Sequence, residues 1–262
     1  MGQVRRPAVA GTFYPGSREE LAETVRACLD AAGAPAEAPP KAVVAPHAGY
    51  VYSGPVAGSA YTRLAPLRGR VERVVLLGPA HRVACRGLAA PSCDAFATPL
   101  GDVPLDREAL DRALALPQVE TNDLAHADEH SLEVHLPFLQ TVLGAFQLAP
   151  FVVGEAKPGE VAEVLELLWG GPETLLVVSS DLSHYHEYAT ARRIDAETTR
   201  AIEALDPDAI SHEQACGRIP VQGLLLAARR HGLAARAVDV RSSGDTAGPR
   251  DRVVGYGSYV LA

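Results

Sequence analysis

Residues 73–81 read RVVLLGPAH, in which a short aliphatic run ends in a Gly-Pro turn and a histidine. A run of this length, bounded by turn residues, is typical of a strand that is buried on both faces. The same arrangement occurs in KAVVAPH (residues 41–47) and in TLLVVSSDLSH (residues 174–184). Helical patterns separate the three runs, so the chain is predicted to form a mostly parallel or mixed sheet that helices cover on both faces.

The other predicted elements extend this α/β pattern along the chain. Helices are expected at residues 17–32, 56–64, 106–116, 131–143, 158–168, 189–204 and 221–231, and further strands at 87–90, 96–99, 147–153, 234–240 and 253–260. The Ala/Pro-rich stretch 33–40 is expected to be a short connector. Neither a repeat nor a break in composition divides the chain, so residues 1–262 are predicted to form a single domain.

The composition excludes several classes of protein. Hydrophobic residues make up 47% of the 262 residues, enough to bury a core without disulfides, and the formal net charge of -8 argues against a nucleic-acid surface. The four scattered cysteines form no C-x-x-C pair and are expected to be buried or half-buried thiols in a reducing compartment. The start of the chain has no secretory h-region, and no apolar run is long enough to span a bilayer, which favours a cytoplasmic protein.

The positions of the histidines carry the functional signal. His47, His81 and His184 each follow a predicted strand, and ligands of open α/β sheets bind beyond the carboxyl ends of the strands. Parallel strands would bring these three loops to the same edge. Because neutral imidazole is the commonest metal ligand in proteins, we expect the three histidines to converge on one metal-type site.

Two imidazoles and one carboxylate leave open coordination positions on Fe(II), and a third histidine nearby can act as acid or base. The carboxylates to consider are Asp181, Glu129, Glu133 and Asp245. Asp245 lies in a glycine-flanked turn after the strand predicted at 234–240, so it also follows a strand end. An aspartate that caps its own turn would give the same pattern, and both interpretations stay open.

Residues 128–133 (DEHSLE) form a second polar cluster. His130 and Glu133 are three residues apart and would share a helix face if the helix starts early, although a charged first helical turn explains the pattern equally well. Several catalytic patterns are missing from the sequence: a P-loop lysine, G-x-G-x-x-G after a strand, G-x-S-x-G and H-E-x-x-H.

Seven motifs carry a resemblance to a known family and extend from residue 5 to residue 259. They are RRPAVAGTFYP, APHAGYVYSGPVAG, LLGPAHR, DEHSLEVHLPFLQ, VVSSDLSHY, CGRIPVQGLL and SSGDTAGPRDRVVGYGSY. Through these motifs the chain resembles the Memo family, whose bacterial and archaeal branch is called AmmeMemoRadiSam system protein B. That family is similar in fold to the class III extradiol dioxygenases, the LigB-like proteins.

The resemblance implies roles for individual residues. His47, His81 and Asp245 would be the metal ligands, His184 would match the acid/base histidine of the dioxygenases, and His130 would be a further histidine of the pocket. Through the family's genomic companions, the resemblance also implies a radical-SAM protein and an AMMECR-type domain as pathway partners.

These observations favour a non-haem-iron oxidoreductase of dioxygenase type. Fe(II), with zinc or copper as alternatives, would activate a small aromatic or otherwise oxidisable substrate, and His184 would move a proton. Two alternatives stay open: a non-catalytic protein that binds a metal, a ligand or a partner in the same pocket, and a metal-dependent hydrolase in which the ion activates water.

Overall fold

Four parallel strands form the centre of the sheet in the computed structural model, which describes residues 2–33 and 38–262. In spatial order they are β2 (Ala42–Ala45), β9 (Thr174–Ser179), β3 (Arg73–Pro79) and β8 (Gln147–Val153). Their residues are almost all buried, as expected for parallel strands with helices on both faces. The three strands that precede His47, His81 and His184 are therefore direct neighbours.

Strands at both edges complete a mixed sheet. β12 (Val253–Leu261) runs antiparallel to β2 and also pairs with β10 (His184–His186) and β11 (Ala235–Ser242). At the other edge, β4 (Leu88–Ala90) runs antiparallel to β8 and pairs with β7 (Val119–Thr121). A small separate sheet joins β1 (Val4–Arg5), β5 (Ala95–Thr98) and β6 (Gly101–Pro104). The predicted fold class, α/β with a mixed sheet flanked by helices, is confirmed.

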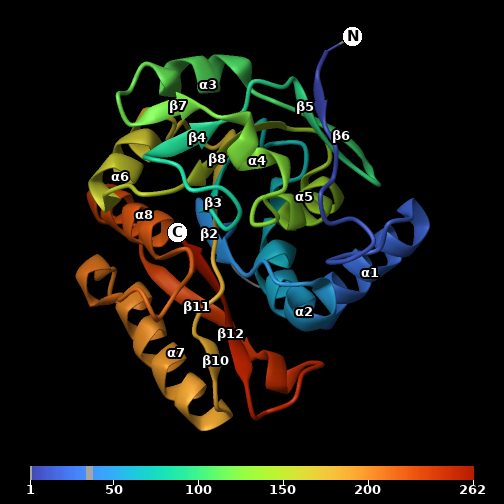
Figure 1. Ribbon diagram of the computed structural model, residues 1–262, viewed down its shortest axis with the longest axis vertical. Helices are drawn as coiled ribbons and strands as arrows, with labels where there is room; N and C mark the ends of the chain where they lie inside the picture. The colour runs from blue at the N-terminus through green and yellow to red at the C-terminus, as the bar shows by residue number, and fades with distance from the viewer. Residues whose placement is uncertain (1, 34–37) are drawn as a thin grey trace.

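Helices cover both faces of the sheet (Figure 1). One side carries α6 (Pro158–Leu167) and α8 (Arg218–Arg230), and the other carries α1 (Arg18–Ala31), α2 (Tyr50–Tyr61) and α5 (Leu136–Leu143). The remaining helices are α3 (Arg107–Leu114), α4 (Asp123–Ala127) and α7 (Tyr188–Glu203), with short 3-10 turns η1 (Thr62–Leu67), η2 (Glu133–His135), η3 (Pro207–Ala209) and η4 (Ser243–Asp245). None of the described helices is both long and apolar enough to cross a membrane.

The structure differs from the predicted elements mainly where elements are short. β1, β6, β7, β10 and α4 were not predicted, because segments this short depend on pairing partners far away in the sequence. The helix predicted at 56–64 begins earlier, at Tyr50, and passes through Pro55. The first part of the helix predicted at 131–143 is a loop followed by the 3-10 turn η2. Residues 34–37 of the predicted connector lie outside the described residues.

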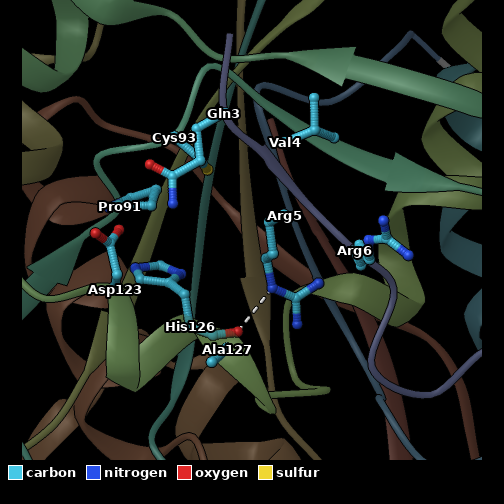
Figure 2. Close-up of a pocket in the computed structure, with 9 residues that line it drawn as sticks. All are labelled: Gln3, Val4, Arg5, Arg6, Pro91, Cys93, Asp123, His126 and Ala127. Atoms are coloured by element: carbon cyan, nitrogen blue, oxygen red, sulfur yellow. Dashed lines mark hydrogen bonds between the residues drawn. The ribbon is translucent and has the colours of Figure 1, made fainter. Parts of the chain in front are cut away.

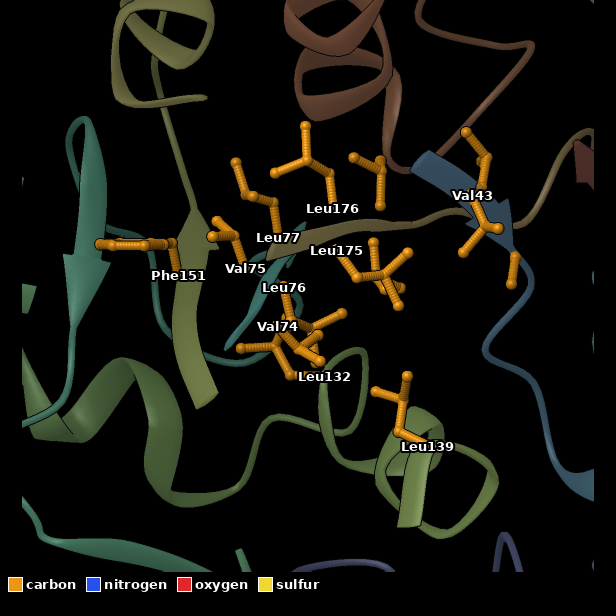
Figure 3. Close-up of a cluster of buried hydrophobic side chains, with 14 of the residues drawn as sticks. Val43, Val74, Val75, Leu76, Leu77, Leu132, Leu139, Phe151, Leu175 and Leu176 are labelled. Carbon is orange, nitrogen blue, oxygen red and sulfur yellow. The ribbon is translucent and has the colours of Figure 1, made fainter. Parts of the chain in front are cut away.

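The core lies on both faces of the central strands (Figure 3). Val75, Leu77 and Leu176 point to one face, and Val74 and Leu76 point to the other, following the two-residue alternation of a strand. These side chains are fully buried. The strand ends are therefore held at fixed positions, which is what a site built from strand-end loops requires.

A buried carboxylate anchors the N-terminal segment. Glu133 is fully buried and accepts hydrogen bonds from Arg5 Nη1 (2.7 Å) and from the hydroxyl of Tyr14 (2.6 Å). It also accepts the backbone N–H groups of Ala8 (2.7 Å) and Val9 (3.0 Å). Four donors thus satisfy one carboxylate that would otherwise be costly to bury.

Arg5 extends this anchor to the loop that carries His130. Its Nε donates to the carbonyl of His126 (2.7 Å), a contact drawn in Figure 2, and its Nη2 donates to the carbonyl of Glu129 (2.8 Å). The N-terminal segment therefore holds this loop from outside the sheet.

We predict that Glu133→Gln lowers the free energy of unfolding by about 3–5 kcal/mol, because it leaves the Arg5 guanidinium buried without a counter-charge. Urea denaturation measures this quantity. The matched control is Glu197→Gln, which removes one partner of the exposed Arg193–Glu197 pair (3.0 Å) and should cost less than about 1 kcal/mol. Equal losses in the two variants would contradict a structural role for the buried pair.

Candidate metal centre

Three histidines lie just beyond the carboxyl ends of the central strands. His47 follows β2, His81 follows β3, and His184 comes after β9 and begins β10. All three line a single cavity of about 1010 Å³. The rings of His47 and His81 are close, with centroids 5.1 Å apart. The convergence that the sequence predicted for the three loops is therefore present in the structure.

His130 joins these histidines from the loop that Arg5 holds. Its ring centroid lies 4.7 Å from that of His81 and 5.5 Å from that of His47. His130 lies before η2, so it shares no helix face with Glu133, which points toward the N-terminal segment instead. The two residues of the DEHSLE cluster thus have different roles, one at the cavity and one in the anchor.

Cys216 lies at the same place. It is half-buried, within the expectation for the cysteines, but its position beside the histidines was not predicted. Its Sγ is 3.3 Å from Nε2 of His47. One donor atom each from His47, His81 and Cys216 lies within 4.8 Å of the others. Cys216 begins the motif CGRIPVQGLL, but nothing in that motif marks it as a metal ligand, because it comes from the loop before α8 and meets His47 only in the fold.

A chain of hydrogen bonds fixes the orientation of the His47 ring. The hydroxyl of Ser179 donates its only proton to the carbonyl of Ser131 (2.6 Å), so its oxygen must accept the Nδ1–H of His47 (2.6 Å). In this tautomer Nε2 of His47 carries the free lone pair. That is the nitrogen next to Cys216, and it is the atom that could bind a metal ion.

Glu129 orients His81 in the same way. Its carboxylate accepts from Nδ1 of His81 (2.9 Å), from the backbone N–H of His81 (2.6 Å) and from the N–H of Ser131 (2.9 Å). Burial alone would raise the pKa of Glu129, but the hydrogen bonds from His81 and Ser131 lower it to about 2. Glu129 is therefore ionised, and it leaves Nε2 of His81 as the free nitrogen. A carboxylate behind a histidine is the usual support of a metal-binding imidazole.

His47 and His130 are neutral at pH 7 and can donate lone pairs. Burial, followed by the neighbouring histidines, lowers the pKa of His47 well below its ordinary value. Burial also lowers the pKa of His130 to about 4. Burial and the nearby Asp181 raise the pKa of the Cys216 thiol, so without a cation its sulfur keeps the proton. A bound metal ion would be needed to convert it to the thiolate.

The four carboxylates considered from sequence lie in four different environments. Glu129 supports His81, and Glu133 belongs to the N-terminal anchor. Asp181 lines the cavity, is almost fully buried, and accepts the backbone N–H of His47 through Oδ1 (2.8 Å). Its burial raises its pKa to about 7. Among these carboxylates, Asp181 and Glu129 are thus the ones that shape the site.

Asp245 lies away from the histidines. Its Oδ1 accepts the hydroxyl of Tyr188 (2.6 Å), and its Oδ2 accepts the N–H and the hydroxyl of Ser242 (2.9 and 3.0 Å). It lines a different cavity, between α7 and β11. The structure therefore does not bring Asp245 to His47 and His81, and its contacts are those of a residue that caps its own turn.

The donors that do converge fit a metal ion. Two imidazole nitrogens and one sulfur are ligands typical of zinc, copper and iron. Both imidazoles have their second nitrogen occupied by Ser179 or Glu129, so each ring presents one lone pair. Such an arrangement of two supported histidines beside a cysteine, at the wall of a cavity, is suited to metal binding.

Comparison with known proteins agrees with the sequence motifs. The family model described as Memo-like protein matches residues 5–260. A MEMO1 family protein of Aeropyrum pernix is 37% identical over 278 residues, covering 97% of this chain and 98% of its own. One from Aquifex aeolicus is 38% identical over 267 residues, covering 97% of each. The crystal structure of an uncharacterised Escherichia coli K12 protein has a similar fold, with a TM-score of 0.52 at 13% identity over 84% of this chain and 98% of that one. This chain belongs to the Memo family.

Proposed function

We propose that this protein is a metal-dependent oxidoreductase whose ion is bound by His47, His81 and Cys216. The observation that supports this is the meeting of three donor atoms, one from each residue, within 4.8 Å at the wall of a large cavity. Fe(II) is the proposed ion, with zinc or copper as alternatives. A redox-active ion bound here would supply electron transfer to or from a small molecule in the cavity.

This ligand set replaces the one that the resemblance implied. Cys216 takes the third position in place of Asp245, so the set is softer than two histidines and a carboxylate. The sulfur donor also suits zinc, which supports a second candidate function, a hydrolase in which the ion polarises water or a carbonyl. The identity of the ion distinguishes the two.

His184 and His130 are the proposed proton carriers. Both line the cavity, and burial lowers the pKa of each, so both are neutral acceptors at pH 7. Among the described residues, no hydrogen bond reaches Nδ1 of His130, which is buried next to Glu129, and this leaves Nε2 as the nitrogen that would meet a ligand. Asp181 has a positioning role, since it holds the backbone of His47.

Metal analysis of anaerobically purified protein should find about one ion per chain. We predict that His47→Ala and Cys216→Ser each lower metal affinity by at least about tenfold, since each removes one of three ligands. Asp245→Ala is the control and should keep the wild-type affinity, because the carboxyl of Asp245 faces Tyr188 and Ser242. Loss of metal in Asp245→Ala with full retention in Cys216→Ser would contradict the proposed ligand set.

The residues behind the ligands should also matter. We predict that Glu129→Gln and Ser179→Ala each weaken metal binding by about 10- to 100-fold, because the imidazoles lose the partners that fix their tautomers. Competition with a chromophoric chelator measures the affinity, and ¹⁵N NMR of the metal-free protein measures the tautomers directly.

The matched control is Ser258→Ala, which removes another buried hydroxyl that donates to a backbone carbonyl, that of Val56 (2.7 Å). Its metal affinity should equal that of the wild type. If Ser179→Ala behaves like this control and the His47 tautomer is unchanged, the hydroxyl of Ser179 does not orient the ring.

A further inference from the structure

Tyr185 occupies a β-bulge beside the cavity. His184 pairs with Val254 and His186 pairs with Val253, so β10 has one residue more than β12 at this point. Tyr185 is that extra residue, and its φ is 61°. This left-handed conformation is one that glycine adopts readily and that a bulky aromatic residue adopts only with strain. Bulges of this kind commonly redirect a side chain next to a binding site.

The bulge puts three consecutive side chains at the cavity. In a regular strand, His184 and His186 would face one side of the sheet and Tyr185 the other. In this structure all three line the same cavity. Tyr185 is 64% exposed, which makes it one of the most exposed large hydrophobic residues among those described. Strain that displays an aromatic ring at a cavity is typical of ligand binding rather than of packing.

Two arginines, Arg82 and Arg252, line the same cavity as Tyr185. The guanidinium of Arg252 lies over the ring of Tyr185, 5.1 Å from its centroid. Arg82 follows His81 and lines the cavity, and within residues 2–33 and 38–262 its side chain has no hydrogen bond or ion pair. Two carboxylates also line this cavity. Asp181 is buried and accepts the backbone N–H of His47, so Glu213 is the acidic side chain that opposes the charge of the two arginines.

We propose that the wall of the cavity formed by Tyr185, Arg82 and Arg252 binds a planar aromatic carboxylate. The ring of this ligand would stack on Tyr185, and its carboxylate would be bound by Arg82 and Arg252. A guanidinium binds a carboxylate through two parallel hydrogen bonds, and an exposed tyrosine ring offers a flat apolar surface. Phe13, Tyr52 and Tyr256 add further aromatic lining to the same cavity. The inference deepens the proposed function by naming the substrate class of the same site.

The test compares benzoate with benzamide, which has the same shape and no charge. Titration calorimetry of the full chain should show that benzoate binds about tenfold more tightly than benzamide. In Arg82→Gln this preference should fall to about threefold or less, whereas in the control Arg193→Gln, an exposed arginine on α7, it should stay at the wild-type value. Equal binding of the two probes by the wild type, no binding of either, or an unchanged preference in Arg82→Gln would overturn the inference.

Tyr185→Gly separates a binding role from a structural one. Glycine relieves the left-handed strain, so this variant should melt at the same temperature as the wild type or higher, while its affinity for both probes falls by about fivefold or more. A lower melting temperature together with unchanged probe affinity would show that Tyr185 is a packing residue.

The inference and the proposed function fail separately. Protein treated with a chelator should still prefer benzoate, because the carboxylate is assigned to the arginines. Loss of the preference on chelation, with no effect of Arg82→Gln, would mean that benzoate binds the ion instead, which overturns the inference and supports the metal centre. A preference that persists in a chain shown to bind no metal would support the inference and overturn the proposed function.

Discussion

The parallel register of β2, β9 and β3 is the constraint on which the site depends. Ala45 pairs with Ser179 across β2 and β9, and Leu77 pairs with Val178 across β3 and β9. Because the three strands end at the same edge, His47 and His81 meet above the end of β9. The same register puts the hydroxyl of Ser179 next to Nδ1 of His47. The strand ends thus position the two histidine ligands and the hydroxyl group that orients one of them.

A single residue, Ser131, connects the supports of the two histidines. Its carbonyl accepts the proton of Ser179, and its N–H donates to Glu129, which holds His81. The loop that contains Ser131 has no place in the sheet and is held by Arg5 and by the buried Glu133. Folding of the N-terminal segment and geometry of the site are therefore coupled through this loop. A shift of this loop would displace Ser131, rotate the imidazole of His47 or His81, and so move the lone pair that it offers to a metal ion.

Local signals in the sequence were sufficient for much of the fold. The helices predicted at 17–32 and 106–116 are present as α1 and α3, which Ser17 and Asp106 cap. The strand-end histidines were also found from sequence, because apolar runs and their bounding turns are local features. Cys216 could not be found in this way, since it meets His47, 169 residues away in the sequence, only in the folded chain. Asp245 shows the reverse case, because its position after a strand end suggested a metal ligand. In the structure both of its carboxylate oxygens accept hydrogen bonds, one from Tyr188 and the other from Ser242 in its own turn.

The central claim is that sulfur from Cys216 and nitrogen from two histidines bind one metal ion. X-ray absorption spectroscopy of the full chain, reconstituted anaerobically with Fe(II), tests this most directly because it identifies the ligand atoms. The account predicts one sulfur neighbour with imidazole nitrogens in the wild type, and no sulfur neighbour in Cys216→Ser. A wild-type spectrum with only nitrogen and oxygen neighbours would contradict it.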